Sequence, residues 1–178
     1  MYIGFITENA TVGTTPESGA AYEAPAQTRI GHVHLQVTDI DKALGFYRDI
    51  LGFKVMQRLG NQVAFVSAGG YHHHIGLNTW NSLGGLPARR QGAGLYHTAI
   101  LYATRAELAG ALRQLVAAKY PIAGSADHGV SEAIYLDDPD GNGVELYWDR
   151  PPAQWPLAAD GSVQMYTRAL DLNALLAE

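Results

Sequence analysis

The chain contains an internal repeat, in which one succession of sequence patterns occurs twice. A strand-like stretch at 31–37, where apolar and polar residues alternate, precedes an apolar helix-like stretch and three further short strand-like stretches. The same order begins again with a strand-like stretch at 95–102 and a helix-like stretch at 107–120. Such a repeat favours two similar β-α-β-β-β modules, each with one apolar sheet face covered by its helix. We therefore predict an α+β protein whose paired modules form a curved mixed sheet, a cup with the helices outside.

Short capping patterns mark the ends of the predicted helices. Thr38 and Asp39 stand where an N-cap is needed before the first helix, and Gly52 is suited to end it. Thr104 and Glu107 have the spacing of a capping box at the start of the second helix.

The repeat also predicts the domain organisation. Residues 1–29 form an N-terminal arm, and residues 30–149 form the repeat domain with modules at about 30–90 and 92–149. Residues 150–178 are a C-terminal extension that ends in a short amphipathic helix. Sequence leaves open whether this helix packs on its own domain or on a second subunit.

Composition narrows the chemistry available to the chain. There are seven histidines and no cysteine, so a metal ion would be bound through nitrogen and oxygen atoms. The formal net charge is −5 and the Lys and Arg residues form no patch, which argues against a nucleic-acid partner. No apolar run reaches the length of a membrane span and no secretory leader is evident. A cytoplasmic protein is expected.

Three candidate metal ligands are predicted on the polar sheet face, two by strand alternation (His32 and Glu145) and one by its matching place in the repeat (His97). His32 and His97 occupy corresponding places in the first strands of the two modules, and Glu145 lies in the last strand. Two histidines and one carboxylate on one side of an ion leave coordination positions open, as in non-haem Fe(II) oxygenases. We predict that His32, His97 and Glu145 bind a metal ion.

Three stretches together resemble the vicinal-oxygen-chelate superfamily, which includes glyoxalase I, bleomycin-binding proteins and type I extradiol dioxygenases. They are IGHVHLQVTDIDKALGFYRDILGF, YHTAIL and YLDDPDGNGVELYW, within about 30–148. The resemblance implies paired β-α-β-β-β modules around a divalent metal, with its ligands at His32, His97 and Glu145. Residues 64–79 lack the carboxylate that glyoxalase I would place there, so the catechol 2,3-dioxygenase-like branch fits best.

Resemblance to that branch implies further site residues. Tyr135 matches the family's active-site tyrosine, and His128 a second family histidine. Within the run from His72 to His74, matching Gly76 to a small family residue selects His73, whereas strict strand alternation selects His74. We favour His73 and expect His73, His128 and Tyr135 to serve catalysis. Candidates for an aromatic wall of the pocket are Phe65, Trp80 and Tyr147.

The implied activity is ring opening of a catechol-like diol by O2 at Fe(II), next to the two hydroxyls rather than between them. Two rivals remain at this point. One is a non-redox lyase, isomerase or transferase that uses Mn(II), Ni(II) or Zn(II), and the other is a protein that binds or sequesters a small molecule. The resemblance also favours a homodimer, with a small aromatic diol and O2 as partners.

Overall fold

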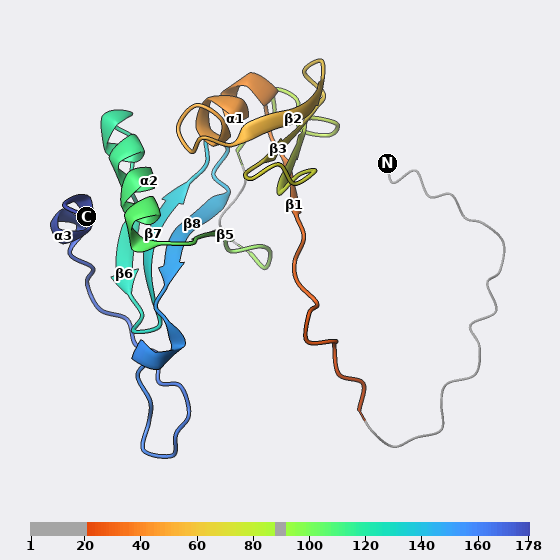
Figure 1. Cartoon of the computed structure of the whole chain (residues 1–178). Coiled ribbons are helices and arrows are strands. Elements are labelled where there is room, and N and C mark those ends of the chain that lie inside the picture. Colours follow the sequence, from red (N-terminus) through yellow and green to blue (C-terminus); the bar gives the residue numbers. More distant parts are fainter. Residues whose placement is uncertain (1–20, 88–91) are drawn as a thin grey trace. The chain divides into compact units, whose positions relative to one another are not determined.

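The computed structural model describes residues 21–87 and 92–178, of which residues 31–178 form one compact unit (Figure 1). Residues 21–30 belong to a separate unit, in which the Thr28 amide donates to the carbonyl of Pro25. The predicted domain boundaries at 29 and 149 stay predictions, and residues 1–20 of the N-terminal arm lie outside the described residues. Within the described part of the chain, no helix has the length and apolar character needed to cross a membrane.

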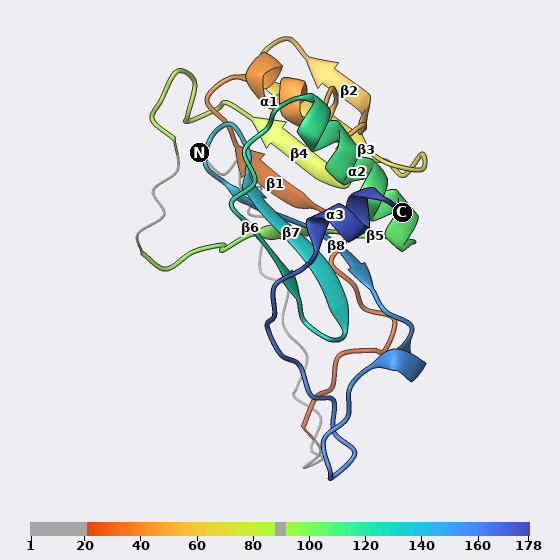
Figure 2. The ribbon, with the colours of Figure 1, turned by 90° about the vertical axis from the view of Figure 1, so that its left-hand side faces the viewer.

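The first module is a four-stranded sheet with one helix. Its strand order is β1-β4-β3-β2, with β1 and β4 parallel and the other neighbours antiparallel (Figure 2). The elements are β1 (Val33–Gln36), α1 (Ile40–Tyr47), β2 (Lys54–Leu59), β3 (Val63–Ser67) and β4 (Ile75–Asn78).

The second module repeats this architecture. Its strand order, β5-β8-β7-β6, matches that of the first module position by position, and only β5 and β8 are parallel. The α+β class and the paired β-α-β-β-β modules are therefore confirmed, as two separate four-stranded mixed sheets. The elements are β5 (Thr98–Tyr102), α2 (Arg105–Ala117), β6 (Gly124–Asp127), β7 (Ser131–Asp137) and β8 (Gly143–Asp149).

The helices begin where the capping residues predict and bury one apolar face each. The Asp39 side chain accepts from the Lys42 amide at the start of α1, and Thr104 and Glu107 form a complete capping box on α2. Helix α2 ends earlier than predicted, at Ala117. The buried faces pack on the sheets in one hydrophobic core, whose fully buried members include Leu44, Phe46, Leu77, Leu108, Leu112, Leu115, Ile134 and Leu146.

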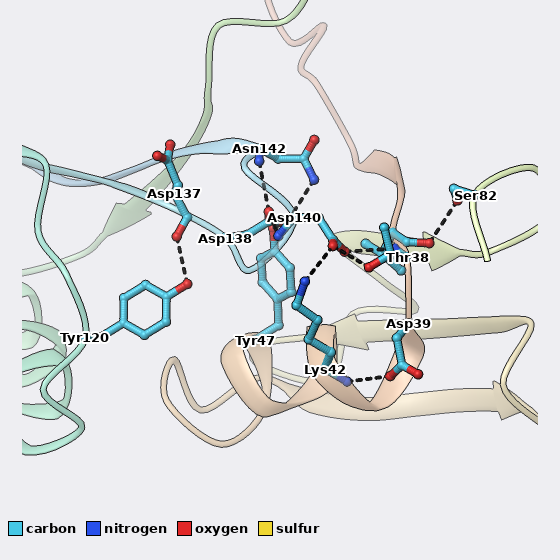
Figure 3. A network of polar contacts seen from close by, with 11 residues as sticks. Thr38, Asp39, Lys42, Tyr47, Ser82, Tyr120, Asp137, Asp138, Asp140 and Asn142 are labelled. Atoms are coloured by element: carbon cyan, nitrogen blue, oxygen red, sulfur yellow. Dashed lines mark hydrogen bonds and ion pairs between the residues drawn. The ribbon is translucent and has the colours of Figure 1, made fainter. Parts of the chain in front are cut away.

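A short loop between β7 and β8 joins the two modules. The carboxylate of Asp140, which is 2% exposed, accepts hydrogen bonds from the amide and the hydroxyl of Thr38 at 2.9 and 2.5 Å (Figure 3). It also forms an ion pair with Lys42 at 3.0 Å. In the sequence, the run from Pro139 to Gly143 indicates only a turn at this loop. The structure shows that the turn carries a buried carboxylate onto the first turn of α1.

A second buried carboxylate, Asp138, completes the same junction. The Tyr47 hydroxyl donates to Asp138 Oδ2 at 3.0 Å, while the amides of Asp140 and Asn142 donate to Oδ1 at 2.9 Å (Figure 3). Burial and the neighbouring Asp138 carboxylate raise the pKa of Tyr47 well above its ordinary value, so it remains a hydrogen-bond donor. Asp138 thus shapes its own loop and holds it against α1.

The C-terminal extension packs on the second module of the same chain. It includes a 3-10 turn, η1 (Pro152–Gln154), and helix α3 (Leu172–Leu176), which lies against α2 (Figure 1). Leu175 is fully buried in the core, and Arg113 donates to the Leu176 carbonyl at 3.2 Å. The question that the sequence left open is therefore answered for this helix.

Candidate active site

Two of the predicted metal ligands meet in the second module. His97 lies just before β5, two residues before Ala99, and therefore on the same sheet face as Ala99. The parallel register pairs Ala99 with Glu145 in β8, so the His97 and Glu145 side chains project from one face. His97 Nε2 lies 3.0 Å from Glu145 Oε2. The other ring nitrogen of His97 is buried and has no hydrogen-bond partner among the described residues. An imidazole nitrogen and a carboxylate oxygen so close together are donor types that suit a divalent metal.

Gly143 allows this approach of His97 to the sheet. A Cβ at position 143 would overlap the Tyr96 carbonyl oxygen and come within 3.1 Å of the His97 Cβ. Only glycine therefore fits beside the segment that carries the ligand. Sequence includes Gly143 in a turn-forming run, but no local pattern reveals this contact.

Tyr135 and His128 extend the His97–Glu145 pair. Strand β7 pairs Tyr135 directly with Glu145, and the Tyr135 hydroxyl donates to Glu145 Oε1 at 2.8 Å. His128 Nε2 lies 2.7 Å from the same hydroxyl. Burial, followed by the hydrogen bond to Glu145, raises the pKa of Tyr135 above its ordinary value. The structure thus connects four of the six predicted site residues in one chain of polar contacts.

The other two predicted residues meet in the first module. His32 lies just before β1, and its ring centroid is 4.5 Å from that of His73, which also contacts Phe65 at 4.9 Å. Burial of the His73 ring, followed by the proximity of His32, lowers its pKa, which favours the neutral imidazole. His74 instead places Nδ1 3.0 Å from the Ser67 hydroxyl. Of the two alternatives, His73 is therefore the one beside His32.

The three predicted ligands do not gather in one group. Among residues 21–87 and 92–178, no three His, Asp or Glu side chains are arranged so that they could hold a metal ion. His32 projects from the first module, whereas His97 and Glu145 belong to the second, and the two sheets share no strand pairing. The full set His32, His97 and Glu145 therefore stays a prediction.

The predicted aromatic wall is divided in the same way. Phe65 and Trp80 both contact the ring of His34, with centroids 5.9 and 5.6 Å away. Tyr147 lies in β8 of the second module, two residues beyond Glu145. Burial of the His34 ring, followed by the nearby His32, lowers the pKa of His34. Phe65 and Trp80 thus lie beside the histidines of the first module, whereas Tyr147 lies on the same strand as Glu145 in the second module.

A cavity of about 480 Å³ adjoins the His97 side of the site. Its lining includes His97 and Tyr135 together with Tyr96, Gly124 and Asn142. Pockets for small molecules range from about 300 to 1,000 Å³, so this cavity is large enough for a compact ligand.

Comparison with known families agrees with this architecture. A profile of the Glyoxalase/Bleomycin resistance protein/Dioxygenase superfamily matches residues 29–146, which is most of the described unit. The chain belongs to this superfamily. A glyoxalase/dioxygenase structure from Nostoc punctiforme superposes with a TM-score of 0.58 at 21% identity, covering 75% of this chain and all of that one. At this identity the likeness concerns the fold alone.

Two curated relatives are more similar to this chain in sequence. A catechol-2,3-dioxygenase from Bacillus subtilis (strain 168) is 41% identical over 151 residues, which cover 85% of this chain and 52% of the relative. A biphenyl-2,3-diol 1,2-dioxygenase from Rhodococcus globerulus is 32% identical over 126 residues, which cover 68% of this chain and 63% of the relative. The chain thus spans about half the length of the first and under two thirds of the second.

Proposed function

We propose that this superfamily member is a metal-dependent extradiol-type dioxygenase, which opens the ring of a catechol-like substrate with O2. The observation that carries the proposal is the contact chain from His97 through Glu145 and Tyr135 to His128. It combines metal-ligand chemistry with groups that can hydrogen-bond a phenolic substrate. The 41% identity to a catechol-2,3-dioxygenase supports the same activity.

The proposed metal is Fe(II), held by His32, His97 and Glu145. A bound divalent ion would act as a Lewis acid that lowers the pKa of a coordinated hydroxyl and as a template for the diol. The adjacent donor atoms of His97 and Glu145 support two of these ligands. The assignment of His32 rests on its matching position in the repeat and on the family resemblance.

His73, His128 and Tyr135 are the proposed catalytic residues. Tyr135 and His128 would hydrogen-bond the substrate oxygens, since their polar atoms converge beside Glu145. His73 would act as the acid/base, because its lowered pKa leaves a neutral ring that can accept a proton at neutral pH. The proposed assembly is a cytoplasmic homodimer, whose oligomeric state light scattering would measure.

Anaerobic reconstitution followed by oxygen measurement tests this function. We expect the Fe(II)-loaded protein to consume O2 when at least one member of a panel of catechols is added, while Glu145→Gln loses both the metal and the activity. Zn(II)-loaded protein is the matched control and should consume no O2. A protein that binds Fe(II) without O2 uptake on any catechol would overturn the dioxygenase assignment. Turnover of a substrate with Mn(II), Ni(II) or Zn(II) and without O2 would favour a non-redox enzyme instead.

A further inference from the structure

The C-terminal extension reaches the active site through three consecutive residues, Tyr166 to Arg168. His128 Nδ1 lies 3.0 Å from the Tyr166 carbonyl oxygen, and the Tyr166 amide donates to the His128 carbonyl at 3.2 Å. One residue pair further along, Asp127 and Arg168 exchange two backbone hydrogen bonds of 2.9 Å. This segment, called the 166–168 segment below, therefore adds a short edge to β6 directly beside His128.

A backbone carbonyl restricts the protonation of the imidazole that it contacts. The carbonyl oxygen of Tyr166 can only accept, so a hydrogen bond at 3.0 Å requires the proton of His128 to be on Nδ1. The Thr167 hydroxyl, 3.3 Å from the same nitrogen, can accept from it as well. In the neutral ring, Nε2 then carries a lone pair and faces the Tyr135 hydroxyl at 2.7 Å. The single proton of that hydroxyl then has two acceptors within reach, His128 Nε2 and Glu145 Oε1, and can be donated to either.

We propose that the 166–168 segment is a positioning element of the active site: the Tyr166 carbonyl holds His128 as the Nδ1–H tautomer, with Nε2 directed at Tyr135. The inference rests on the proposed catalytic role of His128 and Tyr135. It gives the C-terminal extension a part in the chemistry besides the packing of α3 on α2.

Two features at the turn between β6 and β7 hold the 166–168 segment in this place. Gly129 has a φ of +80°, and a Cβ there would come within 2.7 Å of both the Tyr166 ring and Pro156, so the extension packs where a side chain would otherwise stand. Arg150 forms an ion pair with Asp127 at 2.6 Å, which fixes the strand end that the segment pairs with. The hairpin is thus shaped to receive the extension.

NMR of metal-free protein with 15N-labelled histidine tests the tautomer directly. In spectra recorded at about pH 8, we expect the His128 signals to show the proton on Nδ1. His128→Gln, which lacks those signals, provides the assignment. A proton on Nε2 in the unaltered protein would overturn the proposal, whatever the outcome of the activity measurements.

A proline at position 168 separates the positioning role from general packing. Arg168→Pro removes the amide that donates to Asp127, whereas Arg168→Ala keeps it and serves as the control. Fast hydrogen exchange of the Asp127 amide in Arg168→Pro would verify that the segment has detached. We then expect the His128 proton to redistribute toward Nε2 and kcat to fall about tenfold or more with little change in KM. A detached segment with an unchanged tautomer would contradict the proposal.

The two kinds of readout distinguish the possible failures. An Nδ1–H tautomer in a protein that oxidises no catechol would leave the positioning intact and overturn the proposed function. Catechol oxidation that continues unchanged in Arg168→Pro would instead overturn the positioning role alone.

Discussion

Thr38 and Asp140 lie 102 positions apart in the chain, yet two hydrogen bonds join them, at 2.9 Å from the Thr38 amide and 2.5 Å from its hydroxyl. Asp140 is buried, and its carboxylate also pairs with Lys42. This contact joins the N-terminus of α1 to the loop that leads into β8, the strand that carries Glu145. A change that destabilises this junction between the modules is therefore expected to affect the position of Glu145 in the site.

Asp140→Asn should destabilise the protein. The side-chain amide of the asparagine keeps one acceptor oxygen but loses the charge that pairs with Lys42. Its NH2 group would also face the Thr38 and Lys42 groups, which are themselves donors. A buried, charge-assisted contact of this kind contributes about 1–3 kcal/mol to the free energy of unfolding. Urea denaturation would measure the loss. Asp41→Asn, at an exposed ion pair with Arg58, is the control and should change the free energy much less, because solvent screens exposed ion pairs.

The same carboxylate predicts a pH dependence of stability. Burial raises the pKa of Asp140, but the hydrogen bonds from Thr38 and Lys42 together outweigh it, and the net pKa is lowered. A carboxyl whose folded pKa lies below its unfolded value stabilises the fold above the unfolded pKa, near 4, and loses that contribution as the pH falls through the folded pKa. The stability difference between the unaltered protein and Asp140→Asn should be constant above about pH 5 and shrink at lower pH. A difference that grows on acidification would contradict this.

Gly143→Ala should disturb the proposed metal site, although Gly143 itself is not a ligand. The added methyl group overlaps the Tyr96 carbonyl, so the backbone next to His97 must move, at a cost of about 1–3 kcal/mol. We expect weaker metal binding in equilibrium dialysis as well. Gly124→Ala is the matched control, since Gly124 lines the same cavity and a Cβ there has no heavy atom within 4 Å. Equal effects of the two substitutions would show that Gly143 has no special role.

Tyr135→Phe should separate catalysis from metal binding. The change removes the hydroxyl between Glu145 and His128 but leaves the contact of His97 with Glu145 in place. We expect kcat to fall about a hundredfold, in line with the loss of a hydrogen-bond donor to a reacting substrate oxygen, while metal content stays near that of the unaltered protein. Metal analysis beside steady-state kinetics measures both. Loss of the metal with normal folding would assign Tyr135 to metal binding instead.

The elements of this fold are largely predictable because their signals are local. Strand alternation and the capping box of Thr104 and Glu107 depend on neighbours within a few residues. The Leu residues of α3 predict an amphipathic helix, but their pattern does not specify α2 as its partner. The contact between Thr38 and Asp140 is likewise beyond prediction, since the turn residues around Asp140 indicate only a turn.

For the site too, local signals are predictable from the sequence, whereas contacts between distant segments are not. Strand alternation and the parallel register bring His97 and Glu145 together, and Tyr135 follows from its pairing with Glu145. His32 obeys the alternation within its own module, but how it relates to His97 depends on two sheets that share no strand pairing. Tyr166 contacts the His128 ring through its backbone carbonyl. Every residue has such a carbonyl, so the amino-acid sequence gives no indication of this contact.

The most direct test of the account is the product formed under 18O2, with its mass measured by mass spectrometry and its cleaved bond located by NMR. The protein, loaded with Fe(II) and supplied with the catechol that supports O2 uptake, should yield a ring-opened product that contains both atoms of one O2 molecule. The cleaved bond should lie next to the two hydroxyl-bearing carbons rather than between them. A ring cleaved between the hydroxyls, or a product without 18O, would contradict the proposed extradiol chemistry.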